Sequence, residues 1–188
     1  MIVKGLDFRC TCDACPEQYD VYDNNNNIVG YVRLRFGSLT CDYPDVNGKE
    51  IYYLRGKQEN PEALQSQLDI IAADKREKAV FVGMYRITDF YPHYSGSFYF
   101  FDCDFTPIVE SNATDFVAFS QTVANDIARR MILAGAEESR VRIFDTNDPA
   151  IIFKALDEID AKVVYILTNT YHAPEIKAYF EEGGAPNG

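Results

Sequence analysis

The sequence predicts an α+β protein, in which an N-terminal antiparallel β-meander is joined by a helix to a mixed β-sheet flanked by helices. Three observations lead to this fold class. The early segment 28–36 alternates apolar and polar residues with a period of two. Later segments repeat apolar residues at helical spacing. The last third places a helical segment between two short apolar runs, which is the order of a parallel crossover connection.

The composition is that of a folded and strongly acidic protein. Of the 188 residues, 47% are hydrophobic and 14% aromatic, which is enough for a substantial core. The formal net charge is -11, and a surface of that sign repels nucleic-acid phosphates. We therefore expect no direct binding of nucleic acid. The acidity either provides solubility or forms a face for a basic partner.

Residues 1–56 are predicted to form the meander, the first of three parts. The four asparagines at 24–27 suit a turn, because Asn tolerates left-handed backbone conformations. Segment 28–36 then returns as a strand with one solvent-facing side. Asn47 and Gly48 predict a hairpin turn into the next strand.

The second part is a connecting helix at 57–78, and the third is an α/β module at 79–188 that either stands apart from the meander or continues it. Asn60 and Pro61 are a typical helix start, with Asn as the cap and Pro in the first turn. Leu64, Leu68 and Ile71 form the buried stripe of this helix.

The α/β module is predicted from alternating apolar runs and helical stripes. The long helix rests on apolar residues at helical spacing from Phe116 to Met131, and Gly135 ends it. Asp148 and Pro149 begin the next helix as cap and first-turn residue. The predicted elements are strands at 80–88 and 97–105, a helix at 115–134, a strand at 140–144, a helix at 149–159 and a strand at 162–167.

Four cysteines near the start are a candidate metal site: Cys10, Cys12, Cys15 and Cys41. Zinc takes about four ligands in a tetrahedral array, which this set can supply. The spacing favours reduced packing thiols, because structural zinc sites usually pair two CxxC-type turns and Cys41 stands alone. An odd total of five cysteines indicates a reducing cytosol.

Polar residues follow the predicted strands at the edge where ligands bind in open α/β sheets. Carboxylate, amide, hydroxyl and imidazole groups at this edge suit a small polar ligand or proton transfer. The alternative is that they are ordinary turn residues, as Asp148 already caps a helix. No catalytic residue is assigned. The candidate ligand-binding residues are Asp102, Asp104, Asp145, Thr146, Asn147, Asn169, Thr170 and His172.

Two resemblances extend this interpretation. The segments CPEQYDV (15–21), GYVRLR (30–35) and CDYPD (41–45) resemble small uncharacterised proteins of bacteriophages and their bacterial hosts. That resemblance implies an accessory protein in the bacterial cytosol. The second half, including FDTN (144–147) and AIIF (150–153), is similar in element order to the acyl-CoA N-acyltransferase (GNAT) fold, which implies acetyl-CoA as a cofactor.

We therefore predict a non-enzymatic acidic binding protein, encoded by a phage or prophage, that engages a basic surface of a host protein. The alternative is a GNAT-like acyltransferase, or a small-ligand enzyme with its site at the carboxyl ends of the C-terminal parallel strands. Segment 110–115 favours the binder, because it has no glycine for a close backbone cradle around a pyrophosphate. No cofactor is expected, and zinc and acetyl-CoA are the alternatives. The sequence has no run of 18 apolar residues, so no membrane span is predicted. The oligomeric state is not assigned.

Overall fold

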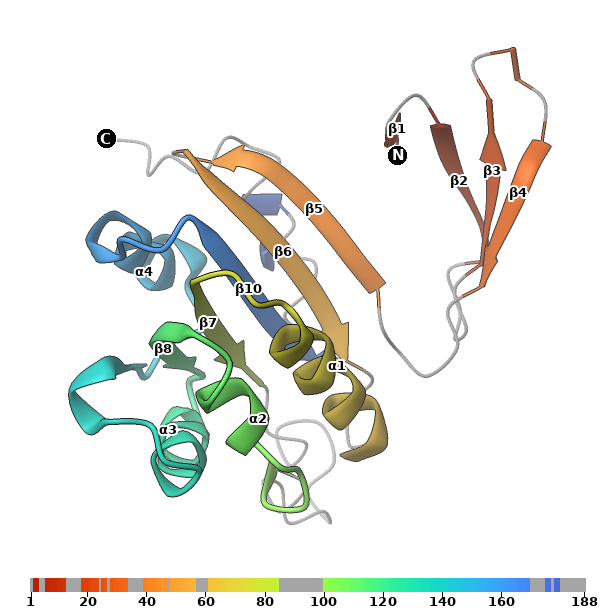
Figure 1. Cartoon of the computed structure of the whole chain (residues 1–188). Coiled ribbons are helices and arrows are strands. Elements are labelled where there is room, and N and C mark those ends of the chain that lie inside the picture. The colour runs from red at the N-terminus through yellow and green to blue at the C-terminus, as the bar shows by residue number, and fades with distance from the viewer. Residues whose placement is uncertain are drawn as a thin grey trace. The chain divides into compact units, whose positions relative to one another are not determined.

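The computed structural model divides the chain into two compact units, Met1–Ser38 and Leu39–Gly188, each with its own β-sheet (Figure 1). The sequence places a boundary at residue 56, whereas the units divide earlier because the strands after Ser38 pair within the second sheet. The residues that the structure describes are 2–3, 6–12, 18–23, 25–26, 28–33, 39–46, 48–56, 61–84, 100–169, 175–176 and 178–179.

The first unit is an antiparallel meander, as its alternating pattern predicts. Its strands lie in chain order, and each pairs antiparallel with the next. Asn26 has a φ of 64°, so the asparagine run does turn through the left-handed region. The strands are β1 (Ile2–Val3), β2 (Leu6–Cys12), β3 (Gln18–Tyr22) and β4 (Ile28–Arg33).

The second unit contains a six-stranded mixed sheet in the order β5-β6-β10-β7-β8-β9. β5 runs antiparallel to β6, and the other five strands are parallel. Gly48 turns the chain between β5 and β6 with a φ of 74°. The predicted class, α+β with a mixed sheet flanked by helices, is therefore confirmed. The strands are β5 (Leu39–Val46), β6 (Lys49–Gly56), β7 (Lys78–Gly83), β8 (Ala113–Phe119), β9 (Val141–Phe144) and β10 (Val163–Asn169).

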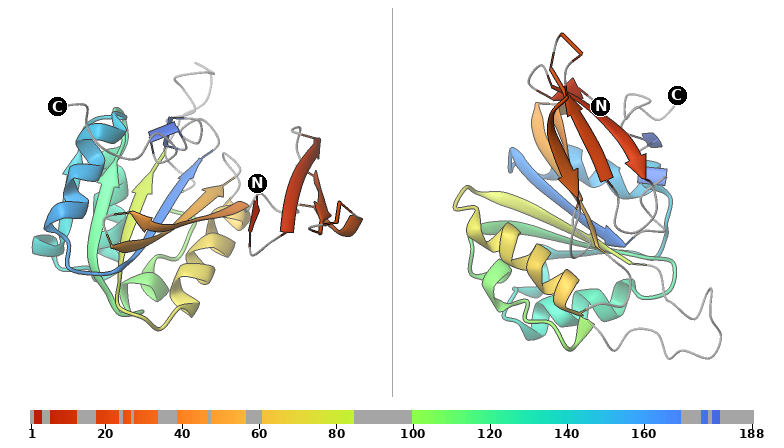
Figure 2. Two further views of the ribbon diagram at one scale, coloured as in Figure 1. Left: turned by 90° about the horizontal axis from the view of Figure 1, so that it is seen from above. Right: turned by 90° about the vertical axis from the view of Figure 1, so that its right-hand side faces the viewer.

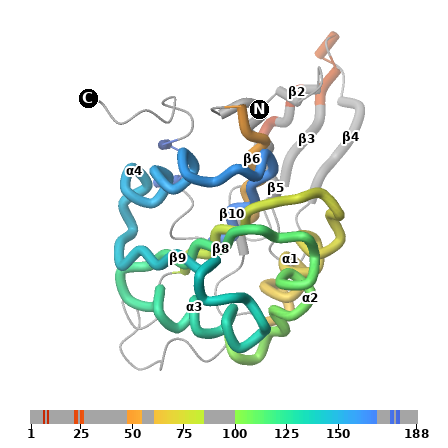
Figure 3. Tube along the Cα trace, turned by 60° about the vertical axis from the view of Figure 1, so that its left-hand side comes forward, coloured from red at the N-terminus to blue at the C-terminus, as the bar shows by residue number. Residues whose placement is uncertain are grey.

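Helices cover both faces of this sheet (Figures 2 and 3). The chain crosses the sheet from β6 to β9 in one direction and then returns to β10, between β6 and β7. Because parallel crossovers are right-handed, outward and returning helices lie on opposite faces. The outward helices are α1 (Pro61–Ala73), α2 (Thr106–Val109) and α3 (Ala124–Leu133), and the return holds α4 (Pro149–Ile152) and the 3-10 helix η4 (Phe153–Glu158). None of the helices among the described residues is long and apolar enough to cross a membrane.

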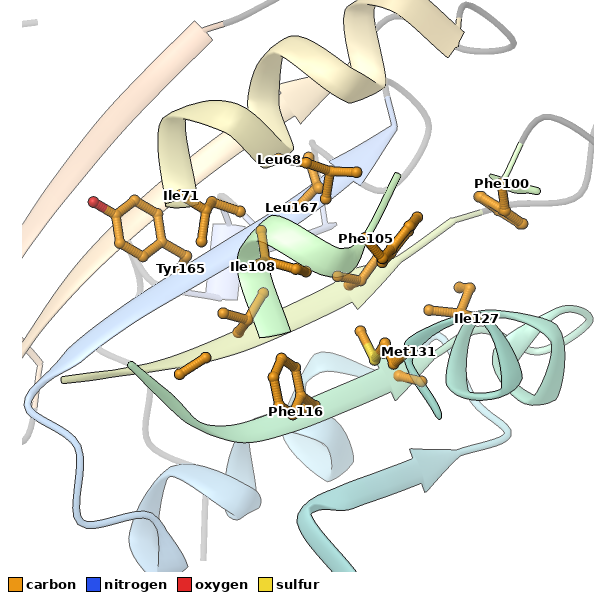
Figure 4. Close-up of a cluster of buried hydrophobic side chains, with 14 of the residues drawn as sticks. Leu68, Ile71, Phe100, Phe105, Ile108, Phe116, Ile127, Met131, Tyr165 and Leu167 are labelled. Carbon is orange, nitrogen blue, oxygen red and sulfur yellow. The ribbon is translucent and has the colours of Figure 1, made fainter. Parts of the chain in front are cut away.

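Each face of the sheet has its own buried core. Ile127 and Met131 of α3 pack with Phe116 on the face of α1, α2 and α3 (Figure 4). The neighbouring residue of β8, Val117, belongs to the opposite core, where it packs with Phe153 of η4. Strands buried on both faces read as continuous apolar runs, which removes the alternation that would identify them in a sequence.

Two predicted elements of the α/β module are wrong, the first of them for this reason. Segment 115–119 was expected to begin the long helix, but it belongs to β8, and the helix occupies only α3. Segment 97–105 was expected to be a strand, but residues 100–105 form an irregular turn, and 97–99 lie outside the described residues. Phe100, Cys103 and Phe105 of this turn are buried anchors with irregular spacing, whereas Phe101 is exposed.

The last two strands are parallel, as predicted, but they are not neighbours in the sheet. β9 and β10 both belong to the parallel set, but β8 and β7 lie between them. The helix predicted at 149–159 is a single turn of α4 followed by η4. The sequence predicts that the carboxyl ends of β9 and β10 are adjacent, and this prediction is wrong.

Candidate functional site

The arrangement of the strands indicates the carboxyl edge of the second sheet as the place for a ligand. β7 and β10 are neighbours, but the chain leaves them toward opposite faces. After β7 it leads to α2 on one face, and after β10 it leads to Ile176, which packs in the core of the other. In open α/β sheets, such divergence opens a crevice beyond the carboxyl ends of the strands.

The sheet is tightly packed at the carboxyl ends of these strands. Gly83, the last residue of β7, lies against Phe119, the last residue of β8, and a Cβ at position 83 would stand 2.0 Å from the ring. Between β6 and β10, the hydroxyl groups of Tyr53 and Thr168 are 2.6 Å apart and buried. These contacts fix the ends of four neighbouring strands.

A polar cluster lies at the carboxyl ends of β8 and β9. The Asp145 carboxylate accepts a hydrogen bond from Asn125 Nδ2 at 3.1 Å. Asn147 Oδ1 accepts from the Gln121 backbone amide at 2.9 Å. Thr146 Oγ1 accepts from the backbone amide of the next turn, at Asp148, at 3.1 Å. The structure thus joins two of the predicted ligand residues, Asp145 and Asn147, to residues that follow β8.

Side chains accept hydrogen bonds from backbone amides in the turn before α3 and at the start of α4. Ser120 Oγ accepts from the backbone amides of Thr122 and Val123, at 3.2 and 3.1 Å, just before α3. The Asp148 carboxylate accepts from the Ala150 amide at 2.9 Å and caps α4. The amides at the start of α4 are therefore already in use, whereas α3 has no side-chain cap.

The other two predicted carboxylates lie in the turn 100–105, beside the start of α1. Asp102 and Asp104 are both exposed. The Asp104 carboxylate accepts from the Thr106 amide at 2.9 Å, and hydrogen bonds from Thr106 hold the pKa of Asp104 below its ordinary value. In the part of the chain that the structure describes, no hydrogen bond or ion pair joins the Asp102 carboxylate to another residue.

Cys103, between the two acids, is a structural thiol. It is buried, and its Sγ donates to the Pro61 carbonyl oxygen at 3.3 Å. Burial, and then the charge of Asp102, raise the pKa of Cys103 to about 11. A thiol with so high a pKa carries almost no nucleophilic thiolate at neutral pH.

Of the remaining sequence-predicted residues, some lie in described strands and others lie outside the described residues. Asn169 is the last residue of β10, and Thr170 and His172 lie outside the described residues. Cys10 and Cys12 are in β2 and Cys41 is in β5, whereas Cys15 also falls outside. Within the described ranges, no three side chains of the His, Cys, Asp or Glu type are grouped to hold a metal ion.

The sequence interpretation missed the partners of these acids, and one error accounts for most of them. Ser120, Gln121 and Asn125 follow β8, a strand that was assigned to a helix. A boundary between the run 113–119 and the following polar residues would have placed all three at the carboxyl edge. Gln65 and Arg130, which contact the turn 100–105, give no sequence signal, because they act through contacts between distant helices.

The comparisons with known proteins indicate a ligase family. The family model described as MurT ligase C-terminal matches residues 58–173, more than half of the chain. A comparison with curated protein sequences gives no match.

Three solved structures of Mur ligases are similar to the chain in shape. The UDP-N-acetylmuramate-alanine ligase MurC of Thermotoga maritima has 11% identity and a TM-score of 0.42, over 96% of this chain and 47% of that one. The MurF ligase of Thermotoga maritima in complex with ADP has 11% identity and a TM-score of 0.43, over 95% and 46%. The UDP-N-acetylmuramoylalanyl-D-glutamyl-2,6-diaminopimelate--D-alanyl-D-alanyl ligase of Acinetobacter baumannii has 10% identity and a TM-score of 0.45, over 96% and 43%. The chain spans less than half the length of each.

The family match overturns the functional interpretation of the sequence. The resemblances to phage proteins and to the GNAT fold are wrong, as is the prediction of a phage-encoded acidic binding protein with an acyltransferase as its alternative. The matched region begins at residue 58, so it excludes the segments that carried the phage resemblance. The GNAT resemblance failed because it depended on two elements, at 97–105 and 115–119, that were wrongly assigned.

Proposed function

This chain belongs to the MurT ligase C-terminal family, and from that premise we propose that residues 39–188 form the C-terminal domain of a ligase. We further propose that its carboxyl edge holds the part of the substrate that carries N–H or ammonium groups. The single observation that carries this proposal is the presence at this edge of exposed carboxylates, Asp102 and Asp145, whose acceptor capacity the described residues leave largely unused.

The charges at this edge favour a hydrogen-bond donor. Asp102 is exposed and carries no bond to a described residue, and Asp145 accepts only from Asn125 among the bonds at this edge. An ionised carboxylate is an acceptor with about four lone-pair sites, so Asp145 keeps capacity for a ligand. A hydrogen bond to a charged acceptor contributes about 1.5–3 kcal/mol, roughly twice a neutral one.

The same edge is unsuited to the phosphates of a nucleotide. The amides at the start of α4 are bonded to Asp148, and the exposed carboxylates of Asp145 and Asp148 repel an anion. The sequence also contains no P-loop of the form GxxxxGK[ST]. A nucleotide that drives the ligation is therefore held mainly by residues outside this edge.

A reducing compartment agrees with the structure. Cys103 is a buried cysteine whose thiol donates to a backbone carbonyl. Free thiols persist in the cytosol, where disulfides are rare. We therefore place the ligase in the cytosol.

The test measures ATP-dependent ligation by the ligase to which this chain belongs, in the variants Asp102→Asn and Asp145→Asn. Each change removes one charge and keeps the size of the side chain. We expect kcat/KM to fall at least tenfold in each, because the amide presents a donor where the substrate also has one. Glu137→Gln is the matched control, since Glu137 is exposed just before the amino end of β9.

A second measurement follows the backbone amides of the isolated chain by NMR during titration with MgADP. The amides of Gln121 and Ala150 should not shift, because both are already hydrogen-bonded. Full activity in both Asn variants, or a saturable shift of these two amides, would show that the carboxyl edge has a different role.

A further inference from the structure

The irregular turn 100–105 is fixed by side chains that reach its backbone from two helices. From α1, Gln65 forms a pair of bonds with the backbone of one residue: its Oε1 accepts from the Asp104 amide at 2.7 Å, and its Nε2 donates to the Asp104 carbonyl at 3.2 Å. The Gln65 side-chain amide thus bonds the backbone N–H and C=O of Asp104, as a neighbouring strand would in a sheet.

From α3, Arg130 holds the same turn on its other side. Its Nε donates to the Phe100 carbonyl at 3.2 Å, and its second nitrogen, Nη2, donates to the Cys103 carbonyl at 2.5 Å. The guanidinium also lies 5.5 Å from the ring centre of Phe105. Because the guanidinium is planar and rigid, two bonds from it fix both the position and the direction of the turn.

The burial pattern shows what this arrangement presents to solvent. Phe100, Cys103 and Phe105 are buried, with exposed fractions of 2% or less. Phe101 and Asp102, between them, are exposed. A turn with no regular backbone ladder is thus held by three buried anchors and two polar side chains, and it exposes one carboxylate, that of Asp102, to which no described residue is bonded.

We infer that Gln65 and Arg130 are positioning residues, which fix the direction of the Asp102 carboxylate toward the ligand of the ligase. This inference rests on the function proposed above. An arginine that neutralised the carboxylate would bond to its oxygens, whereas Arg130 bonds to backbone carbonyls and leaves Asp102 unpaired within the described part of the chain. Misplacement of a reacting group by about 1 Å can lower a rate about a hundredfold, so rigid support of the turn has a direct effect on turnover.

The experiment compares Gln65→Leu and Arg130→Met in the complete ligase with Arg129→Met as the matched control. Arg129 is the neighbouring residue on α3, exposed, and without a bond to the turn. We expect kcat to fall about tenfold or more in the first two variants and to stay unchanged in the control. The Asp104 amide should exchange its hydrogen faster in both variants, including Arg130→Met, in which its own acceptor is intact.

A double-mutant cycle with Asp102→Asn separates positioning from simple stabilisation. If the two residues act through Asp102, Arg130→Met and Gln65→Leu will cause no further loss of kcat in the Asp102→Asn background. Losses that add to that of Asp102→Asn would overturn the inference, because they would show an effect on the fold. If Asp102→Asn is inactive while both other variants keep full kcat, the inference is wrong and the proposed function stands. If Asp102→Asn is itself fully active, both the inference and the proposed function are wrong for Asp102.

Discussion

The two edges of the parallel sheet differ in how far their charged side chains are bonded within the protein. At the amino edge, cations bind backbone carbonyls. Lys78 is fully buried, and its ammonium donates to the carbonyls of Asp74, Arg76 and Ser111. Lys49 donates in the same way to Ile159 and Ala161. At the carboxyl edge, the acids Asp102 and Asp145 keep acceptor capacity that no described residue uses.

This difference separates the stabilising edge from the binding edge. A buried ammonium is stable only when carbonyls replace its hydration, so the amino edge is closed by necessity. An exposed carboxylate is already solvated by water and needs no protein partner. Ligands exchange with such water easily, and the carboxyl edge therefore remains available for them.

The largest effect that would test this comparison is expected at Lys78. Lys78→Met keeps most of the volume but leaves three carbonyls without their donor. We expect the free energy of unfolding, measured in urea, to fall by about 3 kcal/mol. Lys75→Met is the control, because Lys75 is exposed and should change it by less than about 0.5 kcal/mol. Equal losses in both variants would contradict the division between the edges.

Asp74, at the same edge, should give a smaller effect that depends on pH. Its carboxylate accepts from Arg76 at 2.7 Å and from Tyr165 at 2.9 Å, and the bond from Arg76 holds the pKa of Asp74 far below its ordinary value. A pKa that is lowered by folding stabilises the protein above the ordinary value, about 3.9, and this contribution is lost as pH falls toward the folded-state pKa.

We therefore expect Asp74→Asn to lower the free energy of unfolding by about 1.5 kcal/mol at pH 7, with the difference from wild type shrinking below about pH 4. The estimate is moderate because Arg76 is 46% exposed and solvent screens the pair. Urea unfolding at a series of pH values measures it. A difference that persists unchanged at pH 2.5 would show that the charge of Asp74 is not the cause.

Asp148 sharpens the comparison, because it is an acid of the carboxyl edge that does have a structural partner. Asp148→Ala removes the cap of α4 and should lower the free energy of unfolding by about 1 kcal/mol. Asp148→Asn keeps an oxygen that can accept from Ala150 and should recover most of that loss. Thermal unfolding of the two variants makes the measurement, and a similar loss in both would exclude capping as the cause.

The smallest effects on stability are expected at the acids assigned to the ligand. Asp102→Asn and Asp145→Asn should each change the free energy of unfolding by less than about 0.5 kcal/mol, because neither charge is held by a cation among the described residues. Calorimetric unfolding of the purified variants tests this. A loss above 1 kcal/mol in either would assign that residue to the scaffold.

The fold class could be predicted from the sequence, whereas the order of the strands could not. Alternation, helix caps and the Asn47–Gly48 turn are local signals, and they identified the meander, α1 and the turn before β6. The assignment of 115–119 failed because a strand buried on both faces has no alternation to distinguish it from a helix. The same is true of the candidate site. Asp145, Thr146 and Asn147 follow a strand that the sequence predicts, whereas Ser120 follows a strand that it does not predict.

The contact between Gly83 and Phe119 has a consequence for relatives of this chain. The Phe119 ring occupies the volume that a side chain at position 83 would need, and Phe119 is fully buried and has no room to withdraw. The two positions therefore share one volume. Among related sequences, a larger residue at the position of Gly83 should occur together with a smaller one at the position of Phe119. Such compensating pairs would appear in an alignment as covariation between the carboxyl ends of two neighbouring strands, β7 and β8.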